Sequence, residues 1–257
     1  MADSLALRRY SEGRLLALRI NRYSWWTHWR ELADYLLPRR YRWLITPNMM
    51  SRGNPINQHI LDSTGTLAAR NLASGMMSGI SSPTRPWFKL KIGRIDSTQT
   101  SPISLWLAEC ERLLNLIFQE SNFYTSLAIF YFDLVIFGTG VILIYEDFDN
   151  VIRLQNPCAG EYYIDNDGQM RPTIFYREFT LTTSQVVDEF GRGNCSASLL
   201  STYATPDGSG KSREIIVAHG IEPNTNPSKS GISARFKYYE VYWEWSNSTT
   251  PQSGPVT

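Results

Sequence analysis

The stretch SNFYTSLAIFYFDLVIFGTGVILIYED, Ser121 to Asp147, decides the fold. An apolar run from Phe123 to Phe137 follows Asn122, a residue type that caps helices, so we expect a helix over this run. Gly138-Thr139-Gly140 should end the helix, and the β-branched, apolar run Val141 to Glu146 predicts a buried strand. A helix that turns directly into a strand indicates a fold of mixed α and β content.

The same stretch is long and apolar enough to be considered as a membrane span. Phe123 to Tyr145 holds one charged residue, Asp133, in 23 residues. A mid-span aspartate costs about 2.5–3.5 kcal/mol on insertion scales, and the glycine break falls inside the span. The flanks, Glu120 and Glu146-Asp147, are acidic, so no basic residue sets a topology. We therefore favour a buried helix and strand, and expect no membrane partner.

Downstream of this stretch the sequence predicts strands joined by short turns. The expected strands are 151–155, 162–165, 173–179, 213–218 and 236–245, the last without an evident partner. Asn166-Asp167-Gly168 is a strong hairpin signal. Thr183 to Phe190 predicts a short helix capped by the hydroxyls before it and closed by Gly191. Residues 192–212 are rich in Ser, Gly and Asp and predict a loop.

Upstream, the periodicity predicts three helices. A long amphipathic helix covers residues 3–37 and ends before Pro38, and an irregular loop covers 38–58. A second helix runs from about Ile60 to Ile80, with a stripe every fourth residue at Ala68, Leu72, Met76 and Ile80. Its small residues, among them Gly75 and Gly79, allow another helix to approach closely. A strand is expected at 87–92, and a helix capped by Ser101 at 102–120. The fold class is α+β, with N-terminal helices packed on a mixed or antiparallel β region.

Charge is distributed unevenly along the chain, although the net charge is only +1. Residues 1–52 hold ten Arg against four acids, 10 − 4 = +6, which leaves 1 − 6 = −5 for the remainder. Arg39, Arg40 and Arg42 form the densest cluster, near Tyr41 and Trp43. Such a cluster suits phosphate contacts with nucleic acid, or else a solvated helix face and salt bridges at a subunit interface, and we favour the second interpretation.

Signals for an active site are weak. Gly208 to Ser212 ends in GKS, as phosphate-binding loops do, but Thr205 stands where such a loop needs glycine, and strand-like residues follow. A nucleotide-binding protein that uses Gly208–Ser212 is the alternative we keep. His28, His59 and His219 are scattered, and Cys110, Cys158 and Cys195 form no CxxC pair. We expect no catalytic residue, metal or cofactor.

Several segments, in this order and at natural spacing, resemble the head-to-tail connecting (portal) proteins of short-tailed bacteriophages. They are WRELADYLLPR (29–39), LDSTGTLAARNLASGMMSGISSP (61–83), RPWFKL (85–90), NFY to GTGV (122–141), GEYY to REFTLTTSQVVDEFG (160–191), VAHGIEPN (217–224) and FKYYEVYWEW (236–245). Each segment alone is weak. Together they are specific and cover most of the chain.

The resemblance implies a structural subunit of a dodecameric ring at the capsid portal vertex, assembled in the host cytoplasm. DNA would pass through the ring during packaging and ejection, in non-specific contact with it. Terminase, tail or adaptor proteins and capsid proteins would dock onto it. The chain would form the wing of the subunit: 1–120 mainly helical, 121–245 helix plus strand, and 246–257 a disordered tail. Family members run longer, so the channel-lining stem and clip are expected to be missing here.

Within such a wing, two groups of residues are expected to matter. Arg39, Arg40 and Arg42 would lie at a subunit interface or contact DNA phosphates. A second group would serve structural packing, namely Trp29, Trp87, Gly75, Gly79, Gly138 and Gly140.

Overall fold

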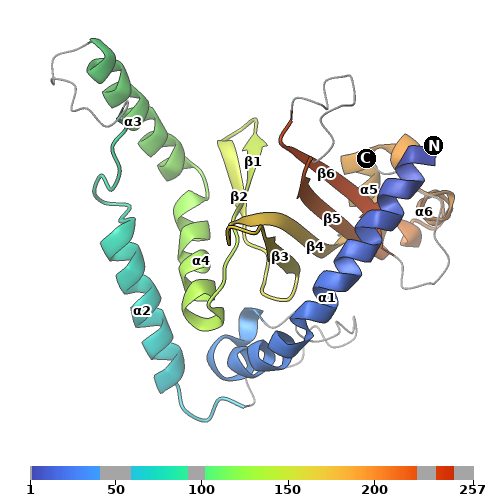
Figure 1. Ribbon diagram of the computed structural model, residues 1–257, viewed down its shortest axis with the longest axis horizontal. Helices are drawn as coiled ribbons and strands as arrows, with labels where there is room; N and C mark the ends of the chain where they lie inside the picture. Colours follow the sequence, from blue (N-terminus) through green and yellow to red (C-terminus); the bar gives the residue numbers. More distant parts are fainter. Residues whose placement is uncertain (1, 41–58, 92–101, 225–235, 246–257) are drawn as a thin grey trace. The chain divides into compact units, whose positions relative to one another are not determined.

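The computed structural model describes residues 2–40, 59–91, 102–224 and 236–245 (Figure 1). The chain forms two compact units, and we describe each by itself. The first, the sheet unit, comprises Met1–Trp26 and Gly160–Thr257. The second, the helical unit, comprises Thr27–Ala159. The expected α+β class is confirmed, since six helices and two antiparallel sheets occur in the described residues. The predicted division of a wing into a mainly helical part, 1–120, and a part of helix plus strand, 121–245, stays a prediction.

Long helices occupy the first half of the chain and strands the second. The helical part consists of α1 (Ala2–Leu36), the 3-10 turn η1 (Pro38–Arg40), α2 (Thr64–Ile80), α3 (Pro102–Glu120) and α4 (Phe123–Phe137). The strands are β1 (Leu143–Asp147), β2 (Val151–Gln155), β3 (Tyr162–Asn166), β4 (Pro172–Thr182), β5 (Glu214–Pro223) and β6 (Tyr238–Glu244). Between β4 and β5 lie α5 (Thr183–Phe190), η3 (Arg192–Asn194), α6 (Ala197–Tyr203) and η4 (Ser209–Ser212).

The sheet unit is a four-stranded antiparallel sheet in the order β3-β4-β5-β6, covered by helices on both faces (Figure 1). Successive residues of a strand point to opposite faces. Ala218 therefore joins the core formed with α1, whereas Val217 joins the core formed with α5 and α6. The first core contains Leu15, Leu18, Tyr163, Tyr176, Ala218, Val241 and Trp243. The second contains Val186, Val187, Cys195, Leu199 and Val217.

Gly220 makes room for the largest ring of the first core. It pairs across the sheet with Tyr176, whose side chain is fully buried. A Cβ at Gly220 would stand 2.6 Å from the ring of Tyr176, which is closer than real side-chain contacts. The aromatic side chain thus occupies the place that a side chain on β5 would take.

The helical unit is built around α4, with the two-stranded sheet β1-β2 after it. Helix α2 packs beside α4 through Ala69 and Ala73, the two buried residues of α2 (Figure 1). Gly65 of the same helix approaches Leu36 so closely that a Cβ would stand 2.8 Å from its Cδ2 atom. Small residues therefore allow close packing on this side of α2, as the sequence predicts.

Several sequence-based expectations about these elements are confirmed. The bounds of α4, β2 and α5 agree with expectation, and the predicted hairpin joins β3 to β4. Helix α4 ends at Gly138, which adopts the left-handed conformation, with φ of 70°. Thr182 and Gln185 form a reciprocal capping box at the start of α5.

Other expectations are wrong, each for a local reason. The expected strand at 87–92 is not a strand in its described part, 87–91; the amide of Leu90 donates to the carboxylate of Glu111 at 2.6 Å instead of to a neighbouring strand. The expected loop 192–212 contains α6, because the Ser196 hydroxyl accepts from the Leu199 amide and caps that helix. Helix α2 begins at Thr64, not near Ile60.

Two further corrections concern polar groups and pairing. Asn122 precedes α4 but does not cap it; its side-chain amide bonds both backbone groups of Leu154 in β2, at 2.8 and 2.9 Å. The last strand has a partner, since β6 pairs with β5 from Tyr238 to Glu244. Part of the loop at 38–58 is the turn η1, and the rest of it, with Arg42, lies outside the described residues.

Candidate functional site

Among the described residues of the sheet unit, the carboxylate of Glu222 on β5 accepts several hydrogen bonds from other elements. Its side chain is buried, and it accepts hydrogen bonds from three phenols and one guanidinium. The donors are Tyr10 and Arg14 of α1 at 3.0 and 3.3 Å, Tyr176 of β4 at 3.0 Å and Tyr239 of β6 at 2.8 Å. Burial, followed by the nearby carboxylate, raises the pKa of Tyr176 and Tyr239, so both phenols remain donors. Glu222 thus joins α1 to three strands.

A second set of ionic contacts joins α1 to the sheet. Arg19 donates to both carboxylate oxygens of Glu178 at 2.7 Å. Burial raises the pKa of Glu178, and the charge of Arg19 opposes that shift. Arg22 lies over the rings of Tyr162 and Tyr163, at 5.1 and 5.3 Å from their centroids, and burial lowers its pKa to about 10. These contacts fix the position of α1 on the sheet.

A third group, Arg177, His219 and Glu240, has the residue types of a catalytic relay. Nε of Arg177 donates to Nδ1 of His219 at 3.1 Å, so the proton of the neutral imidazole sits on Nε2, which lies 2.7 Å from Glu240. Burial lowers the pKa of His219, in agreement with a neutral ring. The ring is 1% exposed and stacks on Tyr242 at 4.2 Å. A substrate cannot reach it, so the group serves packing.

In the described residues of the helical unit, Arg40 and Asp133 form a buried ion pair. The guanidinium of Arg40 binds both carboxylate oxygens of Asp133 and also donates to the carbonyl of Pro157 at 3.1 Å. Asp133 is almost fully buried in α4; burial raises its pKa, and Arg40 opposes that shift. This pair explains the one charge in the apolar run: it joins η1, α4 and the segment after β2.

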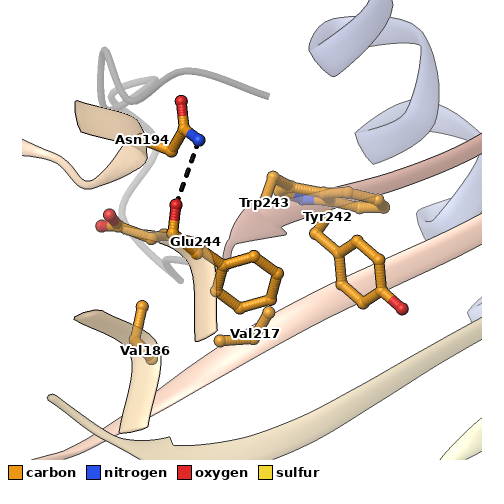
Figure 2. Close-up of a pocket in the computed structure, with 7 residues that line it drawn as sticks. Val186, Asn194, Val217, Tyr242, Trp243 and Glu244 are labelled. Atoms are coloured by element: carbon orange, nitrogen blue, oxygen red, sulfur yellow. Dashed lines mark hydrogen bonds between the residues drawn. The ribbon is translucent and has the colours of Figure 1, made fainter. Parts of the chain in front are cut away.

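A small hollow lies beside the sheet in the described part of the chain (Figure 2). It measures about 300 Å³, open solvent included, and mostly apolar side chains line it. The lining residues are Val186, Phe190, Asn194, Val217, Tyr242, Trp243 and Glu244. The side-chain amide of Asn194 donates one hydrogen bond to the carbonyl of Phe190 at 3.0 Å, which uses one of its two N–H donors (Figure 2). The hollow brings together no nucleophile and base.

The residues proposed for interface or phosphate contact differ in their surroundings. Arg39 is exposed on η1, whereas the guanidinium of Arg40 is committed to Asp133 inside the chain. Arg42 lies outside the described residues. Sequence reasoning grouped the three by spacing and missed Asp133, which lies 93 residues from Arg40.

The residues proposed for packing also separate into two kinds. Trp29 is buried, with its ring 6.5 Å from and nearly perpendicular to that of Phe137, and Trp87 stacks on Phe123 at 6.3 Å. A Cβ at Gly140 would stand 2.8 Å from the Phe130 ring. At Gly75 and Gly79, by contrast, a Cβ would meet no described atom within 4 Å.

The nucleotide-binding alternative finds no support in the geometry. Ser209 to Ser212 form the short 3-10 turn η4, which leads directly into β5. A phosphate-binding loop must lead into a helix whose amino end faces the phosphates. A Cβ at Gly210 would stand 1.8 Å from the carbonyl oxygen of Thr202, so packing against α6 explains this glycine. Lys211 lies over the ring of Tyr203, 5.4 Å from its centroid.

The described residues contain no group of three or more His, Cys, Asp and Glu side chains placed to hold a metal ion. Among them, no helix has the length and apolar character needed to cross a membrane.

In the described residues, the buried charged groups named above join secondary-structure elements to one another. The chain belongs to the bacteriophage head to tail connecting protein family, whose model matches residues 9–254. It is 40% identical over 228 residues to the probable portal protein of Bordetella phage BPP-1, covering 88% of this chain and 40% of that protein. It is 37% identical over 236 residues to the portal protein of Salmonella phage epsilon15, covering 90% and 41%. The chain thus spans about two fifths of these relatives.

Proposed function

We propose that this chain forms the wing of a structural portal subunit, without catalysis of its own. The observation that carries the proposal is the match to the head to tail connecting family over almost the whole chain. The similarity to two portal proteins supports it. The use of buried Arg, Glu and Asp for joining elements agrees with a scaffold.

In this function the subunit assembles with copies of itself into a ring. The resemblance to portal proteins implies that this ring has twelve subunits. The ring stands at the portal vertex of the virion after assembly in the host cytoplasm. Genomic DNA is packaged and ejected through it, and terminase, tail or adaptor and capsid proteins dock onto it. Arg39, exposed on η1, and Arg42 are the arginines we propose for a subunit interface or for non-specific phosphate contact.

The test is the oligomeric state of the full-length protein that carries this chain. Native mass spectrometry and electron microscopy should show a closed ring of identical subunits, and phage lacking the protein should yield heads without DNA. A protein that stays monomeric, or phage that package DNA without it, would refute the proposed function.

A further inference from the structure

His219 stands at the centre of a polar contact that crosses three adjacent strands. Arg177 of β4 and Tyr242 of β6 lie directly opposite His219 of β5, one on each side, and the three strands lie side by side (Figure 1). Nε of Arg177 donates to Nδ1 of the imidazole at 3.1 Å, and Nε2 lies 2.7 Å from Oε1 of Glu240 on β6. We call Arg177, His219 and Glu240 the cross-strand bridge.

The cross-strand bridge requires a neutral imidazole. A neutral histidine has one donor and one acceptor nitrogen, whereas a protonated histidine has two donors. Nδ1 has to be the acceptor, because a guanidinium only donates. A proton on Nδ1 would therefore set two N–H donors and two positive charges against each other. Arg177 is buried, so little water screens that repulsion, and the guanidinium would have to move away from the ring.

Among the described residues that face the ring, Glu240 acts in the opposite direction, since its carboxylate attracts a protonated imidazole. The side chain of Glu240 is 50% exposed, and its Oε1 atom also accepts from the hydroxyl of Tyr242 at 2.6 Å. Solvent therefore weakens this attraction. Burial of the ring, together with the charge of Arg177, outweighs it and lowers the pKa of His219. Phe175, which packs edge-on against the ring, carries no charge.

Strand β6 covers the ring of His219. Tyr242 stacks on it with 4.2 Å between the ring centroids and 4° between the ring planes, and His219 is 1% exposed. In the described residues β6 is an edge strand, paired with β5 alone. Water can therefore reach the imidazole when Tyr242 and Glu240 move away from it.

The two ends of β6 are held in different ways. At its end, Glu244 accepts hydrogen bonds from the amide and the hydroxyl of Ser196 at 2.8 and 2.7 Å. The leading half of β6, Tyr238–Tyr242, has contacts on both faces of the sheet: on one face the cross-strand bridge, and on the other the buried Val241 and the hydroxyl of Tyr239, which donates to Glu222 at 2.8 Å. Loss of the bridge thus removes the contacts of one face.

We propose that protonation of His219 releases the leading half of β6 from β5, whereas the neutral ring holds it in place. The pKa of His219 in the folded chain lies below the unfolded value of about 6.5. The closed arrangement is therefore fully stabilised above about pH 6.5 and loses stability as pH falls below that value. This pH-sensitive opening belongs to the sheet unit alone and does not depend on the proposed function.

Hydrogen exchange measured by mass spectrometry on the full-length protein that carries this chain tests the proposal. After correction for the intrinsic exchange rate at each pH, peptides that cover Tyr238–Tyr242 report the opening of β6. Their opening equilibrium constant should rise between pH 7 and 5 by up to about 25-fold, the limit for a group with a pKa of about 6.5 in the open state and no proton in the closed state. Peptides from β3, the other edge strand, should change by less than about twofold.

Two variants and a control assign the effect to His219. His219→Gln keeps an acceptor for Arg177 and a donor for Glu240 but does not titrate, so the pH dependence of β6 should disappear. His28→Gln removes an exposed histidine and is the matched control, which should behave as the wild type does. Arg177→Met covers the case in which His219→Gln does not fold. It removes the charge that opposes protonation, so the closed state binds a proton more readily and the rise should become smaller.

Three results would overturn the proposal. The first is a wild-type protein in which β6 opens equally at pH 7 and 5. The second is an equal rise in β3 and β6, which would mean that the sheet opens as a whole. The third is an unchanged pH dependence in His219→Gln. Ring formation is measured separately, so none of these results bears on the proposed function.

Discussion

The two units of the chain treat their apolar surface differently. In the sheet unit, helices cover both faces of the sheet, and Tyr162, Tyr163 and Tyr176 are each at most 2% exposed. In the helical unit, α2 and α3 expose Leu72 at 56% and Trp106 at 63%. Exposed apolar side chains also occur in the sheet unit, where Ile20 and Tyr23 of α1 are 73% and 79% exposed. The difference lies in the core: the sheet unit encloses large buried rings, whereas α2 buries only Ala69 and Ala73 and α3 fully buries none of its residues. Substitutions in the two units should therefore change stability by different amounts.

The largest effect should come from the buried ion pair of the helical unit. Asp133→Leu removes the carboxylate that Arg40 binds and leaves a buried, uncompensated guanidinium, a change that typically costs about 3–5 kcal/mol. Urea unfolding of the variant and the wild type measures this loss. Glu109→Gln, which breaks the exposed pair with Arg112, is the matched control and should leave stability unchanged. Equal stability of Asp133→Leu and wild type would contradict a structural role for the pair.

The next effect separates the two tryptophans of the helical unit. Trp29→Ala should lower the free energy of unfolding by about 3–5 kcal/mol, because its side chain is buried against Phe137. Trp87→Ala should cost less, since Trp87 is half-buried and stacks on Phe123 near the surface. Denaturant titration of both variants tests the order. A larger loss for Trp87 would mean that the stacked rings of Trp87, Phe118 and Phe123 stabilise this unit more than the contact of Trp29 with Phe137 does.

Two glycines allow a direct comparison of a tightly packed position, Gly220 in the sheet unit, with an open one, Gly75 in the helical unit. Gly220→Ala forces a methyl group against Tyr176 and should destabilise the sheet unit by about 1–3 kcal/mol. Gly75→Ala adds a methyl group in open space and should stabilise the subunit by about 0.5–1 kcal/mol. Thermal unfolding of the separated subunits checks both signs. A destabilising Gly75→Ala would contradict the open space found around this glycine.

The elements that sequence reasoning placed well are those with local signals. Helix α4 is bounded by an abrupt apolar run and a left-handed Gly138, and α5 by a capping box and Gly191. The missed elements depend in part on residues far away in the sequence. The segment around Leu90 is held by Glu111, and α6 appears inside a Ser-rich stretch whose Ser196 bonds Glu244 of β6.

The hydrogen-bond and ion-pair partners of Glu222 and Asp133 could not be predicted either, because most of them lie far away in the sequence. Glu222 is one of several acids near strands, and nothing local shows that Tyr10 and Arg14 of α1 reach it from more than 200 residues away. Asp133 was recognised as unusual, but its partner Arg40 was assigned to another role. Only the tertiary fold brings these charges together.

The smallest effect concerns pH and the half-exposed Glu240 of the sheet unit. Its hydrogen bond with His219 lowers the pKa of Glu240 to about 2. Because the folded pKa lies below the unfolded one, near 4.3, this contribution is present above that value and is lost as pH falls toward 2. Glu240→Gln should therefore flatten the acid limb of a stability–pH curve between about pH 5 and 2. At pH 7 it should cost less than about 1 kcal/mol, because solvent screens a half-exposed group.

A buried His219 with a lowered pKa acts in the same direction at higher pH. Its contribution is present above the unfolded value near 6.5 and declines as pH falls below that value. Glu240→Gln keeps the ring buried and neutral, so the decline that begins below about pH 6.5 should remain in the variant. Urea titrations at pH 7, 5 and 3 distinguish the two groups. If the variant and the wild type lose stability in parallel between pH 5 and 3, Glu240 does not contribute to stability through its charge.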